Sequence, residues 1–230
     1  MVHFTLFGIP VYIRPSFWVV LAIFGGALSI SSVEDLIYPA LFVIAGFVAI
    51  LSHEMGHALV GRKLGGGQQT IVLELFGGLT SSHGMQLTRG GRALMILAGP
   101  MMTLLLGIIS LGLTWNIVAP VMTSYNLNFW DLAISPFTAA LISPKLYTLS
   151  CLIMIGEWWT ILNLLPIYPL DGGQLIAQYI RSPRKVFMTG FITAILIGLL
   201  SFQLFHGYFI PIFMALFAYS NYREYKNAPF

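Results

Sequence analysis

The chain is poor in charged residues and has almost no cysteine. Only 8% of its 230 residues are charged, whereas a soluble domain usually carries about 25%. The single Cys151 excludes an intramolecular disulfide framework and any zinc site built from several cysteines. Lys and Arg are scattered among the predicted loops without an aromatic-basic stripe, so we expect no nucleic-acid partner. The whole chain is 57% hydrophobic with a mean hydropathy of +0.85, which is typical of an integral membrane protein.

The apolar residues fall into six runs that predict an all-α integral membrane fold, forming one transmembrane domain over residues 1–230. Residues 1–14 are expected to lie at the membrane interface, and the proline-interrupted stretch 119–144 to be an interfacial loop or short helix. Strand-forming residues around a Gly77-Gly78 turn predict a short membrane-associated β-hairpin at 69–83, between the second and third helices. The predicted spans are residues 16–31, 39–61, 93–118, 145–165, 186–204 and 208–222.

Six spans would put both termini on the same side of the membrane. Of the 11 Lys and Arg residues, only Lys145 then falls on the opposite side. Because cytoplasmic loops carry an excess of Lys and Arg, this asymmetry predicts that both termini are cytoplasmic. We expect the chain in the cell (plasma) membrane.

One pentapeptide in the second predicted span carries the chemistry. His53-Glu54-Met55-Gly56-His57 matches the HExxH pattern. On a helix, His53 and His57 share one face and can bind one metal ion, while Glu54 can take a proton from a metal-bound water. Ionisable side chains at membrane depth are costly and are usually functional. The alternative is a polar cluster whose hydrogen bonds are satisfied inside a helix bundle.

A second polar position is predicted at a similar depth. Asp171 follows two prolines that cannot continue a regular helix, so the backbone must open there. His53 and Asp171 lie at similar sequence distances from Arg62 and Arg181, which mark the cytoplasmic ends of their elements. Zinc in hydrolytic sites takes about three protein ligands and one water. His53, His57 and Asp171 would supply the three.

At these residues the chain resembles the site-2 protease family of intramembrane zinc metalloproteases, in the compact six-span form of prokaryotes. Besides HExxH, the resemblance rests on the segment 163–173, NLLPIYPLDGG, and more weakly on Phe76-Gly77-Gly78 and Ala98-Gly99-Pro100. Thr103 departs from the Asn that many members carry there. The resemblance implies that one Zn²⁺ ion is bound by His53, His57 and Asp171, that Glu54 is the general base, and that Asn163 binds substrate or stabilises the oxyanion.

The resemblance further implies a zinc metalloendopeptidase that acts in regulated intramembrane proteolysis. It would hydrolyse peptide bonds within or near transmembrane segments of membrane-tethered substrates, from the cytoplasmic side. A transmembrane protein substrate and the lipid bilayer are the expected partners, while no oligomeric state is predicted. The free strand edge of the 69–83 hairpin could accept an unwound substrate, and a proline in residues 71–75 is expected to reduce cleavage without loss of zinc.

Other functions stay open at this point. A polytopic transporter would also use broken helices and buried carboxylates, but it has no need of HExxH, and no inverted repeat is visible. A non-catalytic metal-binding membrane scaffold is the other alternative, and the intact Glu54 argues against it. For Asn163, a helix–helix hydrogen bond or a cap on the fourth span is the structural alternative.

Overall fold

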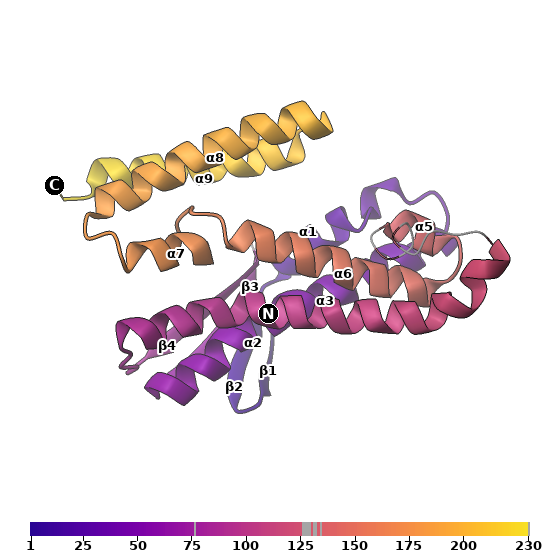
Figure 1. Ribbon diagram of the computed structural model, residues 1–230, viewed down its shortest axis with the longest axis horizontal. Helices are drawn as coiled ribbons and strands as arrows, with labels where there is room; N and C mark the ends of the chain where they lie inside the picture. The colour runs from indigo at the N-terminus through magenta and orange to yellow at the C-terminus, as the bar shows by residue number, and fades with distance from the viewer. Residues whose placement is uncertain (76, 126–129, 131–132, 134, 230) are drawn as a thin grey trace. The chain divides into compact units, whose positions relative to one another are not determined.

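The computed structural model describes residues 1–75, 77–125, 130, 133 and 135–229, which form two compact units, Met1–Thr160 and Ile161–Phe230 (Figure 1). Phe76 of the predicted Phe76-Gly77-Gly78 motif lies outside the described residues, as do 126–129, 131–132 and 134 of the predicted irregular stretch. The single transmembrane domain of the sequence analysis stays a prediction.

The first unit is built on two long helices that pack closely. Helix α2 (Ile37–Gly65) carries the HExxH pentapeptide, and α3 (Arg89–Tyr125) crosses it. A methyl group at Gly56 of α2 would lie 2.3 Å from the carbonyl oxygen of Ala98 on α3, so the absence of a side chain permits this approach. The other helices described in this unit are α1 (Pro15–Phe24), α5 (Pro136–Ala140), most of α6 (Pro144–Asn163) and two 3₁₀ turns, Ala27–Ser29 and Glu34–Leu36.

The first unit also contains a four-stranded sheet, so the all-α prediction needs correction to a mostly helical fold with a small sheet. The strand order is β1-β2-β3-β4. Strands β3 (Gln68–Glu74) and β4 (Gly77–His83) form the antiparallel pair in the segment predicted as a hairpin. Residues 1–14 contain β1 (Val2–Leu6) and β2 (Ile9–Ile13), and β2 pairs in parallel with β3. Their location at the membrane interface stays a prediction.

The buried face of the sheet packs on α2. Ile9, Val11 and Ile13 alternate inward along β2, and they share one core cluster with Ile71 and Leu73 of β3. The same cluster includes apolar residues of α2 on either side of the pentapeptide. This burial holds the sheet beside the HExxH turns of the helix.

Three helices in the described part of the chain are long and apolar enough to cross a membrane. They are α2, the Arg89–Ala119 part of α3 and the Pro183–Leu204 part of α8 (Pro183–Phe205). The predicted first span is interrupted, because α1 has 10 residues and ends before Gly25 and Gly26. Gly26 has a left-handed φ of 87° that a helix cannot include. The six-span count stays a prediction.

The second unit is a helical hairpin that carries a short helix and a loop. Helices α8 and α9 (Phe209–Asn227) run side by side (Figure 1). Helix α7 (Asp171–Ala177) has seven residues, so it ends well before Arg181. The loop 164–170 connects the end of α6 to α7, and its Ile167 is fully buried with Ala194 of α8 and Met214 of α9.

Candidate metal centre

The two histidines of the pentapeptide form a preorganised pair on α2. His53 and His57 lie one turn apart and are only 2% and 8% exposed, and their Nε2 atoms are 3.1 Å apart. The Nδ1 atom of His57 donates a hydrogen bond of 2.9 Å to the carbonyl oxygen of Met95 on α3. With its proton on Nδ1, the ring presents the Nε2 lone pair toward His53, which is the tautomer that a metal ligand needs.

The spacing of the pair suits zinc. Zinc binds imidazole nitrogen at about 2.0–2.1 Å, so two nitrogens of a tetrahedral site lie roughly 3.3 Å apart. The 3.1 Å between the two Nε2 atoms is close to that value. The contact with Met95 is the kind of outer interaction that orients a metal-binding histidine.

Glu54 lies next to the histidine pair and is fixed by the sheet. Its side chain is buried, and the Thr80 hydroxyl of β4 donates a hydrogen bond of 2.7 Å to Oε2. Thr80 Oγ1 also lies 3.1 Å from the backbone carbonyl oxygen of Glu54. The carboxylate is therefore held by a residue that no sequence motif indicated.

Two glycines of the family motifs make room for these side chains. A methyl group at Gly99 on α3 would lie 2.3 Å from Nε2 of His57 and 2.9 Å from Nε2 of His53. A methyl group at Gly78 on β4 would lie 2.2 Å from Cγ of Glu54. Glycine at 78 and at 99 thus has a physical reason, because the backbone approaches the glutamate and the histidines where a larger residue would collide.

Thr103, the departure from the family pattern, makes a polar contact between helices. It is fully buried, and its hydroxyl donates to the carbonyl oxygen of Pro100 at 3.0 Å and lies 2.9 Å from Oγ1 of Thr160 on α6. Threonine at this position therefore forms hydrogen bonds within α3 and to α6.

Asp171 and Asn163 belong to the second unit and flank its loop. Asp171 is the first residue of α7 and is buried, while Asn163 is the buried last residue of α6. A methyl group at Gly172 would lie 2.1 Å from the carbonyl oxygen of Leu164, and one at Gly173 would lie 2.4 Å from the carbonyl carbon of Ile167. The two glycines after Asp171 let the start of α7 pack directly on the loop.

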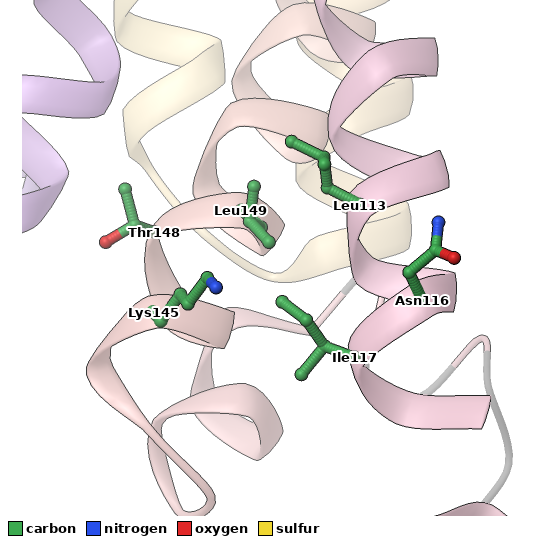
Figure 2. Close-up of a pocket in the computed structure, with 6 residues that line it drawn as sticks. All are labelled: Leu113, Asn116, Ile117, Lys145, Thr148 and Leu149. Atoms are coloured by element: carbon green, nitrogen blue, oxygen red, sulfur yellow. The ribbon is translucent and has the colours of Figure 1, made fainter. Parts of the chain in front are cut away.

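His53, Glu54 and His57 thus lie together in the first unit, and Asp171 and Asn163 lie near each other in sequence in the second. A cavity of about 440 Å³ lies elsewhere in the first unit, between α3 and α6. Figure 2 shows its six described lining residues, which are Leu113, Asn116, Ile117, Lys145, Thr148 and Leu149. None of these six is a histidine, a cysteine or a carboxylate.

Comparison with known proteins agrees with this chemistry. The model of peptidase family M50 matches residues 41–205, and the chain belongs to this family. A zinc metalloprotease of Methanocaldococcus jannaschii is 29% identical over 227 residues, which cover 94% of this chain and 57% of that protein. The chain therefore spans just over half the length of this curated relative.

The fold has a match among solved structures. The site-2 protease from Methanocaldococcus jannaschii superposes with a TM-score of 0.62 at 24% sequence identity, covering 97% of this chain and 94% of that one. The chain thus belongs to peptidase family M50 and has the fold of this site-2 protease. The sequence-based prediction of the family is confirmed, and the name of the curated relative agrees with the predicted metal.

Proposed function

We propose that this chain is an intramembrane endopeptidase in which His53, His57 and Asp171 bind one zinc ion and Glu54 is the general base. The observation that carries the proposal is the arrangement in the first unit. Two histidine nitrogens 3.1 Å apart lie beside a buried glutamate whose second oxygen is already fixed by Thr80. A polar cluster with only a structural role would not need Glu54 to be held in one orientation beside the two histidine nitrogens.

The protein groups divide the work of amide hydrolysis. The zinc ion, when bound, supplies Lewis acidity toward the substrate carbonyl and a water of lowered pKa. Glu54 would accept a proton from the attacking water on Oε1, since Thr80 donates to Oε2, and would later pass that proton to the leaving amine. The side-chain amide of Asn163 donates to the oxyanion that develops.

Strand β4 is the proposed docking edge for the substrate. A helical substrate hides its scissile carbonyl in backbone hydrogen bonds and must be extended before attack. The strand order leaves β4 at an edge of the described sheet, and its Thr80 contacts Glu54. An extended segment added to β4 would therefore run past the general base.

Because β4 is an edge strand, the proline substitution in residues 71–75 that the sequence suggested is not a clean test of substrate docking. Residues 71–74 belong to β3, which is paired on both sides by β2 and β4. A proline there would break the sheet itself and reduce cleavage by misfolding. The edge must be tested on β4.

The substrates we propose are membrane-tethered proteins cut within or near their transmembrane segments. The three long apolar helices and the family support a location in a membrane. We further propose that the membrane is the plasma membrane, that both termini are in the cytoplasm, and that cleavage occurs from the cytoplasmic side. This orientation follows from the Lys and Arg asymmetry together with a six-span count.

The test compares the purified chain with its Glu54→Gln variant on a detergent-solubilised transmembrane substrate. Glu54→Gln keeps the shape of the side chain and all proposed ligands, so we expect full zinc content and a cleavage rate reduced by roughly 10²–10⁴-fold. His57→Ala should lose both zinc and cleavage. Cleavage that persists in Glu54→Gln and in the presence of a chelator would reject the proposal.

A further inference from the structure

Asn221 of α9 is a buried polar residue that is hydrogen-bonded to the loop that precedes Asp171. The residue is 1% exposed. Its Nδ2 atom donates to the carbonyl oxygen of Tyr168 at 2.6 Å and to that of Phe217, in its own helix, at 2.9 Å. Tyr168 lies in the 164–170 loop, shortly before Asp171.

Helix α8 is shaped to admit this side chain. A methyl group at Gly190 would lie 2.3 Å from Oδ1 of Asn221 and 3.3 Å from the backbone nitrogen of Tyr168. The ring of Tyr168 packs edge-on against Phe187 of the same helix, with centroids 5.5 Å apart. Both helices of the hairpin thus contact the loop at one residue.

The loop needs an external donor at this point. Prolines at 166 and 169 remove two backbone N–H groups, so the loop has fewer donors than carbonyl acceptors of its own. The loop also forms local bonds: Leu170 N–H donates to the carbonyl oxygen of Ile167 at 2.8 Å, and the Gln174 side chain donates to that of Pro169 at 2.8 Å. The bond from Asn221 is the one among these that fixes the loop to a distant helix.

We infer that Asn221 is a positioning residue for the Asp171 carboxylate. By holding the Tyr168 carbonyl, it fixes the backbone from which α7 begins, and Asp171 is the first residue of that helix. The inference rests on the proposed function, in which Asp171 is the third zinc ligand. Residues that orient a metal ligand typically change metal affinity by about 10–100-fold when they are replaced.

The experiment measures the zinc dissociation constant of the full chain in detergent by competition with a chromogenic chelator, together with the thermal midpoint. Asn221→Leu keeps the size of the side chain and removes both donors, and we expect the dissociation constant to rise about 10–100-fold. Asn221→Asp, the same shape without the donor, carries the test if the leucine variant does not fold. Asn116→Leu is the matched control, because Asn116 of α3 donates to the carbonyl oxygen of Gly112 in its own helix.

A purely structural role gives a different result. Met214→Ala leaves a cavity in the same core and should lower the thermal midpoint with unchanged zinc affinity. If Asn221→Leu behaves like Met214→Ala, the inference is overturned. Asp171→Ala separates the proposed ligand set from the role of Asn221. Unchanged zinc affinity in Asp171→Ala rejects the ligand set. Weaker zinc binding in Asp171→Ala, with unchanged binding in Asn221→Leu, rejects only the role of Asn221.

Discussion

Thr80 on β4 donates a hydrogen bond of 2.7 Å to Oε2 of Glu54 on α2. A hydrogen bond to a charged group is worth about 1.5–3 kcal/mol. Because Oε2 accepts this bond, Oε1 is the carboxylate oxygen that we propose accepts the proton. The sheet is thus part of the candidate active site as well as of the core.

Replacing this hydroxyl should slow cleavage without releasing zinc. Thr80→Val keeps the shape and removes the donor, so we expect kcat to fall by about tenfold or more, in line with the 1.5–3 kcal/mol of such a bond. Thr80→Ser should restore most of the rate. Thr70→Val makes the same change on β3 and serves as the control. Equal rates for Thr80→Val and Thr70→Val would show that the contact has no catalytic effect.

Adding one methyl group at Gly99 should weaken zinc binding. The methyl would lie 2.3 Å from Nε2 of His57, and relief of that overlap must move the histidine or separate α2 from α3. We expect the zinc dissociation constant of Gly99→Ala to rise at least tenfold. Gly107→Ala lies on the same helix, where a methyl group meets no atom within 4 Å, and should bind zinc normally. Wild-type affinity in Gly99→Ala would contradict the described geometry.

Zinc should stabilise the folded chain through the histidine pair. A ligand that binds only the folded state at 100 times its dissociation constant contributes about 2.7 kcal/mol. Removing zinc with a chelator should therefore lower the thermal midpoint, and adding zinc back should restore it. Glu54→Gln should keep this shift and His57→Ala should lose it. A shift that is the same size in His57→Ala would mean that zinc binds elsewhere.

Strand β4 should cross-link to the substrate in an alternating pattern. The side chain of Leu79 is exposed on this edge strand, and the native Cys151 is buried, so a new cysteine at 79 has little competition. Cysteines placed along the substrate should form disulfides with Leu79→Cys at every second position, as expected for paired strands. Thr5→Cys, exposed on the opposite edge strand β1, is the control. Comparable cross-linking at both edges would refute docking on β4.

The helical turn that joins His53 to His57 could be read from the sequence. Ligand spacing on a helix is a local property, because residues four apart always share a face. The same holds for the break before Asp171, since proline removes a donor wherever it stands. Apolarity also located α2, α3 and α8, but it did not reveal the break at Gly26, because a hydropathy sum takes no account of backbone conformation.

The pairing of β2 with β3 was decided only by the tertiary structure. Val11 lies opposite Ile71, and no local periodicity links strands so far apart in sequence. The contacts of Thr80 with Glu54 and of Asn221 with Tyr168 are of the same kind. Each joins one side chain to a distant partner and leaves no repeat in the sequence. The sequence by itself therefore determined which residues can bind a metal and activate water, whereas tertiary packing decided what holds those residues in position.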